Sequence, residues 1–115
     1  MDKIIDKYFL KEFEDGNLFE KVVDQLTKDL YLSGLEASEV DCSSPITCVT
    51  SLNMFMLNCL RSDPEKLRGF LYRVDLREDE IVNWSEQMNQ EDFSKKLALG
   101  DLYRELQKVL DRKKY

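Results

Sequence analysis

The side chains best suited to bind a ligand lie in the one long stretch of this chain that carries no charge. Residues 42–60 contain no Asp, Glu, Lys or Arg, although 35% of all residues are charged. On a helix over about residues 45–61, Thr47, Ser51 and Asn58 share one narrow stripe of small, neutral, hydrogen-bonding groups. Pockets between helices are mostly apolar with a few such groups. The stripe is therefore the candidate site for a small ligand or partner, and close packing against neighbouring helices is the alternative.

The rest of that helix is apolar over more than half of its circumference, and Asn53 lies inside this apolar arc. An arc of such width predicts a helix that is mostly buried, with neighbours on several sides. A buried amide without a partner costs about 1–3 kcal/mol. We therefore expect Asn53 to bond to a neighbouring helix or loop, and contact with a ligand is the second possibility.

Few kinds of catalysis are compatible with the composition. The chain has no histidine, which removes the commonest general base and most zinc sites. Its three cysteines, Cys42, Cys48 and Cys59, show no Cys-x-x-Cys spacing, so we expect reduced thiols, as in the cytoplasm, and no metal site. Cys48 should pack as a small hydrophobic residue, whereas Cys42, close to a helix start, is a candidate reactive thiol. We predict no catalytic residue and no cofactor.

The charge of the chain argues against nucleic acid and membranes as partners. Its 23 acidic and 17 basic residues give a net charge of −6, and residues 1–41 carry all of it, with eleven acids and five bases. Nucleic-acid binding needs a dense cationic surface, which the short basic stretch over residues 104–115 does not supply. The uncharged stretch holds too many Ser, Thr and Asn residues to span a bilayer, and we expect no signal peptide at the N-terminus.

Apolar residues recur at three- and four-residue steps in the first third of the chain, which predicts two helices. The first covers residues 3–14 and ends at Gly16, and Asn17 then caps the second, which ends at Gly34. The second helix has the clearest apolar stripe of the chain, formed by Leu18, Phe19, Val22, Val23, Leu26 and Leu30.

Two Pro residues mark the next helix starts. Ser44-Pro45 and Asp63-Pro64 both place a capping side chain before a Pro at the first helical position. The helix after Pro64 buries Leu67, Phe70, Leu71 and Val74, although residues 70–76 also alternate in polarity as a short strand would.

The last third is predicted to hold two or three short helices. Asp75-x-x-Glu78 has the pattern of a capping box for a fifth helix, with Ile81, Trp84 and Met88 facing inward. Apolar residues then change from one helical face to nearly the opposite face near Gly100. This change predicts a helix over residues 92–98, then a kink or a helix cap, and then a helix over residues 102–112.

These patterns together predict one all-α domain over residues 1–115, a compact bundle of five or six helices around the uncharged helix 45–61. For function we expect a cytoplasmic, non-catalytic module for protein–protein interaction or regulation, with a protein partner that the sequence does not name. A small-ligand binder or simple enzyme using the neutral stripe is one alternative. An acidic inhibitor or immunity-type protein, whose first third engages a basic target, is the other.

Overall fold

The computed structural model describes residues 16–113, and the helix expected over residues 3–14 lies outside this range. Every regular element within residues 16–113 is helical, which confirms the predicted all-α bundle. In chain order the elements are α2 (Gly16–Leu32), the short 3-10 helix η1 (Ala37–Glu39), α3 (Pro45–Ser62), α4 (Pro64–Arg73), α5 (Glu78–Gln87) and α6 (Gln90–Lys113).

The helix α2 ends where the sequence predicts. Gly34 adopts a φ of +78°, a left-handed conformation that costs glycine little. The N–H of Leu35 donates to the carbonyl of Leu30 and the N–H of Gly34 to that of Tyr31, both at 3.0 Å, which closes the helix end. The predicted stripe faces the core, because Leu18, Phe19, Val22, Leu26 and Leu30 are buried and Val23 is half-buried.

The two predicted Pro starts are confirmed by their capping bonds. The hydroxyl of Ser44 accepts a hydrogen bond from the N–H of Thr47 at 3.2 Å, and α3 begins at the Pro that follows Ser44. The carboxylate of Asp63 accepts from the N–H of Lys66, also at 3.2 Å, and α4 begins in the same way. Local side-chain chemistry therefore sets both helix starts.

The predicted capping box for α5 is wrong, because Asp75 closes α4 instead. Asp75 has a φ of 66°, and its N–H donates to the carbonyl of Tyr72 at 3.1 Å. The N–H of Leu76 donates to the carbonyl of Leu71, also at 3.1 Å, so this end repeats the geometry of the α2 end. Since α4 extends to Arg73, the alternative of a strand over residues 70–76 is wrong as well.

Another predicted cap also lies elsewhere. Gly16 is already the first residue of α2, so Asn17, the expected cap, is inside the helix. At α5 the residue before the helix is Arg77, whose side chain makes no capping hydrogen bond. By contrast, Asn89 caps α6, since its side-chain oxygen accepts from the N–H of Asp92 at 2.8 Å.

The predicted break near Gly100 is wrong, because α6 is one continuous helix of 24 residues. Its two apolar stripes are the edges of a single broad buried face. Between them lie Asp101 and Glu105, which are polar and fully buried, and their presence hid the continuity of this face in the sequence. The buried apolar residues of α6 are Phe93, Leu97, Ala98, Leu99, Leu102, Leu106 and Val109.

Gly100 permits close packing rather than a bend. A Cβ atom at this position would lie 3.3 Å from a methyl group of Leu76 and 3.8 Å from the indole of Trp84. A contact of 3.3 Å is tighter than side chains normally accept. The absence of a side chain therefore lets the segment before α5, and α5 itself, lie directly on α6.

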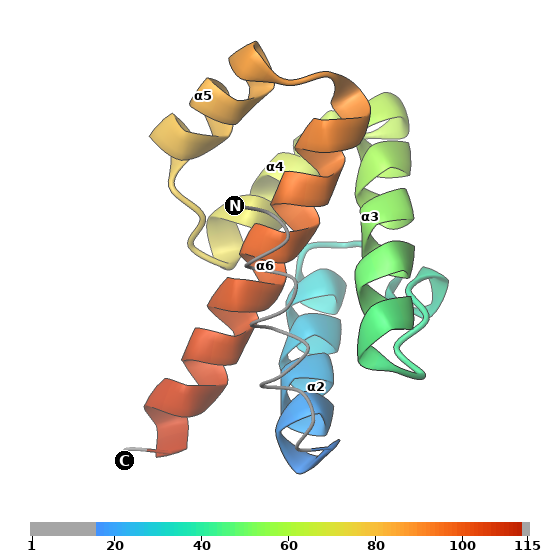
Figure 1. Cartoon of the computed structure of the whole chain (residues 1–115), viewed down its shortest axis with the longest axis vertical. Coiled ribbons are helices and arrows are strands. Elements are labelled where there is room, and N and C mark those ends of the chain that lie inside the picture. Colours follow the sequence, from blue (N-terminus) through green and yellow to red (C-terminus); the bar gives the residue numbers. More distant parts are fainter. Residues whose placement is uncertain (1–15, 114–115) are drawn as a thin grey trace.

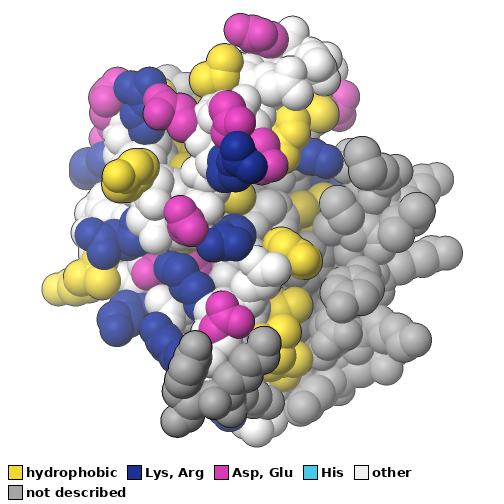
Figure 2. Space-filling model, turned by 90° about the vertical axis from the view of Figure 1, so that its left-hand side faces the viewer, with side chains coloured by type: hydrophobic (Ala, Val, Ile, Leu, Met, Phe, Trp, Pro, Cys, Tyr) yellow, Lys and Arg dark blue, Asp and Glu magenta, His cyan; other side chains and the backbone are white. Residues whose placement is uncertain are grey.

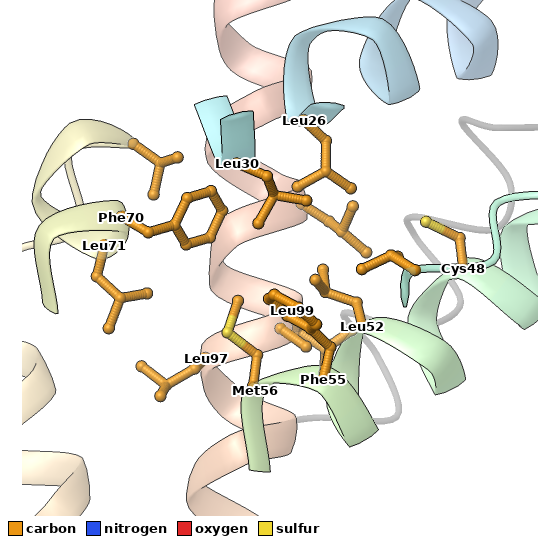
Figure 3. Packing of buried hydrophobic residues seen from close by; sticks show 14 of the residues in the cluster. Leu26, Leu30, Cys48, Leu52, Phe55, Met56, Phe70, Leu71, Leu97 and Leu99 are labelled. Atoms are coloured by element: carbon orange, nitrogen blue, oxygen red, sulfur yellow. The ribbon is translucent and has the colours of Figure 1, made fainter. Parts of the chain in front are cut away.

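The core forms where α2, α3 and α4 meet α6, which crosses the molecule diagonally in Figure 1. Side chains from all four helices converge there, including Leu30, Leu52, Phe70 and Leu99 (Figure 3). As expected, α3 has neighbours on several sides, namely α6, α4 and the connection before it, but it is less buried than predicted: Ile46, on the predicted apolar arc, is 64% exposed. The most central helix is α6, because α2, α3 and α5 all pack against it.

Candidate functional site

The neutral stripe of α3 lies against the connection between α2 and α3. The hydroxyl of Ser51 accepts a hydrogen bond from the N–H of Asp41 at 2.7 Å and donates to the carbonyl of Glu39 at 3.5 Å. The hydroxyl of Thr47 accepts from that of Ser44 at 2.8 Å. Two members of the stripe are thus paired with the chain's own nearby groups.

The two amides of α3 differ in their surroundings. Asn53 is half-buried, and its side-chain oxygen accepts a hydrogen bond from Ser94 of α6 at 2.7 Å, which confirms the expected bond to a neighbouring helix. Asn58 is exposed, about 16 Å along the helix axis from Thr47. The stripe therefore does not converge on one point, and a ligand role for its residues stays a prediction.

A groove of about 610 Å³ opens instead between α4 and α5. Residues of α6 and the end of α3 complete its lining. Most of the lining side chains are apolar, among them Leu60, Leu67, Leu71, Ile81, Phe93 and Leu97. We refer to this feature as the α4–α5 groove; the prediction from sequence did not locate it.

The groove exists because α5 packs against α6 but stands off from α4. None of the residues of α5 is fully buried, and Trp84 is half-buried against α6, with the ammonium of Lys96 5.4 Å from the centre of its ring. Across the mouth of the groove, Arg68 of α4 and Glu78 of α5 form an ion pair at 3.7 Å. Exposed pairs of this kind contribute little, so α5 is held by few strong contacts.

Apolar surface continues from the groove to the outside of the molecule. Tyr72 and Val82 line the groove, yet they are 83% and 48% exposed. Figure 2, which views the side of the molecule where α5 lies, shows hydrophobic side chains among the charged ones. Exposed apolar residues that adjoin a groove are typical of a binding surface.

Charge is divided between two parts of the molecule. Residues 63–92, which include α4, α5 and the first turn of α6, hold nine acids and four bases, whereas residues 93–113 of α6 hold three acids and six bases. Two of those three acids are the buried Asp101 and Glu105. A second hollow, of about 420 Å³, lies between α2 and α6, and its charged lining residues are Lys21, Lys28 and Arg112 with one acid, Asp24. The α4–α5 groove is thus on the acidic part of the molecule, and the second hollow on the basic part.

No family model, no curated protein and no solved structure matches this chain.

Prediction from sequence also missed a group of buried carboxylic acids between α2 and α6. Asp29, Asp101 and Glu105 are all buried. The carboxylate of Asp29 accepts hydrogen bonds from the ammonium of Lys108 at 3.0 Å and from the amide of Gln25 at 3.2 Å. The carboxyl oxygens of Asp101 and Glu105 have no hydrogen-bond partner among the described residues.

Burial decides the charge of these acids. It raises the pKa of Glu105 to about 10, with further contributions from Asp29 and Asp101. Burial, and then the charge of Asp29, raise the pKa of Asp101 well above its usual value. Burial alone would raise the pKa of Asp29, but the neighbouring Glu105, Lys108 and Gln25 together outweigh it and lower this pKa. At neutral pH, Asp29 is therefore ionised and Glu105 is protonated.

This cluster is closed to ligands, because Asp101 and Glu105 have no exposed surface and line neither of the two hollows. We therefore assign it to stability rather than to binding. The sequence did carry a signal: Gln25 with Asp29, and Asp101 with Glu105, are polar pairs four residues apart, so each pair lies on one helix face. Each pair also borders a stripe of buried leucines.

Within residues 16–113, no three His, Cys, Asp or Glu side chains are arranged to hold a metal ion. None of the helices in that range has the length and apolar content needed to cross a membrane.

The three cysteines are free thiols. Cys48 and Cys59 are buried in the core, as predicted for Cys48. Cys42 is half-buried, and its sulfur lies 3.2 Å from that of Cys48. Prediction from sequence treated these two residues separately and missed the contact.

Proposed function

We propose that this protein is a small, non-catalytic, cytoplasmic interaction module that binds an amphipathic, basic helix of a partner protein in the α4–α5 groove. The observation that carries the proposal is the groove itself, an apolar hollow of about 610 Å³ between two helices with exposed apolar residues beside it.

The shape and lining of the groove favour a helix as ligand. Recognition of an amphipathic helix needs a hydrophobic groove that receives side chains spaced three and four residues apart. Leu67 and Leu71 of α4 form one wall and Ile81 of α5 the other. A pocket for a small molecule encloses most of its ligand, whereas this groove continues onto the exposed Tyr72 and Val82.

The charges near the groove favour a basic partner. The stretch of residues 63–92 has a net charge of −5, from nine acids and four bases. Glu65 and Glu78 line the groove, and Glu78 is paired with Arg68. Acidic groups beside an apolar groove attract a helix with Lys or Arg on its polar face and repel an acidic one, which provides specificity.

Further features support a non-catalytic binding role and a location in the cytoplasm. The groove is lined by two carboxylates, one guanidinium and one phenol, and the chain has no histidine. The buried acids lie outside the groove. All three cysteines are free thiols, which is usual in a reducing compartment.

The test uses a synthetic amphipathic peptide of about 15 residues, with Leu on one face and Lys on the other. Trp84 is the only tryptophan of the chain and lies on α5, three residues after the groove residue Ile81, so its fluorescence reports binding. We expect binding that weakens with added salt. A scrambled peptide, and one with Glu in place of Lys, should bind at least about tenfold more weakly.

Two variants identify the surface that binds. Tyr72→Ser removes an exposed ring at the groove and should weaken binding of the basic peptide about tenfold. Tyr31→Ser removes an equally exposed ring from α2, outside the groove, and should leave binding unchanged. Equal effects of the two variants, or equal binding of the scrambled peptide, would overturn the proposal.

A further inference from the structure

Two thiols of this protein are placed to react with each other. Cys42 lies in the connection before α3, and Cys48 is the fourth residue of α3. Their sulfur atoms are 3.2 Å apart, in hydrogen-bond contact. A disulfide needs sulfurs about 2.05 Å apart, so the pair has to close by only about 1 Å. Cys48 is buried at the edge of the core (Figure 3), whereas Cys42 is partly open to solvent.

Several hydrogen bonds hold the connection in the position that brings the sulfurs together. The N–H of Asp41 donates to the hydroxyl of Ser51 on α3 at 2.7 Å. The N–H of Ser43 donates to the carboxylate of Asp41 at 3.0 Å. The residues on either side of Cys42 are thus fixed relative to α3, and the thiol contact follows from this fixed path.

The environment shifts the pKa values of the two thiols in opposite directions. A hydrogen bond from Cys48 lowers the pKa of Cys42, although burial and the nearby Asp41 oppose this effect. The same hydrogen bond, together with burial and the negative charge of the Cys42 thiolate, raises the pKa of Cys48. Cys42 is therefore both the more accessible thiol and the one that ionises first, which are the properties of an attacking thiol.

We propose that Cys42 and Cys48 form a thiol–disulfide exchange site, which a low-molecular-weight disulfide such as oxidised glutathione converts reversibly to an intramolecular disulfide. Nothing in this proposal depends on the function proposed for the α4–α5 groove, because neither cysteine lines it.

The reaction proceeds in two exchange steps. The thiolate of Cys42 attacks one sulfur of oxidised glutathione, breaks its S–S bond, forms a mixed disulfide and releases one glutathione thiolate. Cys48 then loses its proton to solvent, and its sulfur attacks that of Cys42, forming the protein disulfide and releasing the second glutathione thiolate. The two released thiolates take up the protons of the two protein thiols. The protein loses two hydrogens and two electrons, and one oxidised glutathione becomes two reduced molecules.

The second step is favoured by the first. Once Cys42 carries glutathione it is no longer a thiolate, so the main cause of the raised pKa of Cys48 is removed. Cys48 needs no open path for a second glutathione molecule, because the target of its attack is the adjacent sulfur. Buried position and reactivity are therefore compatible for this residue.

The third cysteine is a matched control. Cys59 is buried on the same helix, eleven residues after Cys48 and thus about 16 Å further along the axis, too far for a disulfide. Burial raises the pKa of its thiol. Cys59→Ser removes a buried thiol from α3 without touching the proposed pair.

The experiment equilibrates the full chain with mixtures of oxidised and reduced glutathione, quenches with acid and measures intact mass and peptide masses. We expect a product lighter by two hydrogens, with Cys42 linked to Cys48 and Cys59 free, reached from both the reduced and the oxidised side. Cys59→Ser should give the same product at the same ratio of glutathione forms.

Two variants separate the roles of the thiols. Cys48→Ser should stop at a glutathione adduct on Cys42, and Cys42→Ser should react at least about tenfold more slowly than the wild type. Circular dichroism confirms that each variant is folded. A wild-type protein that accumulates the Cys42 adduct with Cys48 free, or a Cys42→Ser variant that reacts as fast as the wild type, would refute the site.

Discussion

The two sides of α6 differ in how tightly the neighbouring helices pack against them. On one side α2 and α3 pack buried leucines against it, and Asp29 of α2 lies buried with Asp101 and Glu105 of α6; on the other side α5 touches it with no fully buried residue of its own. Both sides use the same helix, and both have apolar residues at helical spacing. The difference shows that amphipathic patterning places a helix on the core, whereas the tightness of packing decides whether that helix is part of the core or the wall of a groove.

The largest effect on stability should come from removing a large buried side chain on the packed side of the bundle. Phe55 is a buried residue of α3, and Phe55→Ala should lower the free energy of unfolding by about 3–5 kcal/mol. Ile81 is half-buried on α5, and Ile81→Ala should cost about 1 kcal/mol. Urea denaturation measures both, and equal losses would show that the two sides are equally packed.

The buried acids should make the packed side sensitive to pH. The folded protein holds a proton on Glu105 up to a pKa of about 10, whereas the unfolded chain releases it near pH 4.5. Between these values the folded state binds one proton more than the unfolded state. The contribution of Glu105 to the free energy of unfolding is therefore fully present at low pH and is lost as the pH rises.

Glu105→Gln should therefore flatten the loss of stability between about pH 6 and pH 9, by at least about 1 kcal/mol over this interval. Asp101, whose pKa is also raised, should account for a remaining slope in the same direction. Chemical denaturation at several pH values measures both. Glu86→Gln, on the exposed face of α5, is the control, and a wild-type stability that does not fall over this interval would contradict the assignment.

Substitution of two glycines compares an open position on α4 with a tightly packed position on α6. Gly69 has no heavy atom within 4 Å of an added Cβ, so Gly69→Ala should stabilise α4 by about 0.5–1 kcal/mol through helix propensity. Gly100→Ala gains the same propensity but must displace Leu76. We expect its free energy of unfolding to fall below that of Gly69→Ala, and thermal or urea unfolding of both variants distinguishes a tight contact from a loose one.

The smallest effect on stability should come from the ion pair at the mouth of the groove. Arg68 and Glu78 are 3.7 Å apart and largely exposed, so Arg68→Gln should change the free energy of unfolding by less than about 0.5 kcal/mol. The same variant removes a positive charge beside the groove and should strengthen binding of the basic peptide several-fold. A weaker affinity would show that Arg68 contacts the ligand instead of repelling it.

The sequence by itself determined three of the helix ends and the apolar stripes. The starts at Ser44-Pro45 and Asp63-Pro64 and the end at Gly34 depend on side chains and backbone groups within a few residues of one another. Such local interactions are readable without the fold. The class of fold followed from the same periodicity.

Only the tertiary structure decided the features that depend on distant segments. Asp101 and Glu105 are buried because α2 covers their face of α6, and this burial joined two apolar stripes into one helix. The contact of Cys42 with Cys48 required the path of the connection, and the groove required α5 to stand off from α4. Each of these depends on how one element packs against another or on the path of a connection, which local periodicity does not encode.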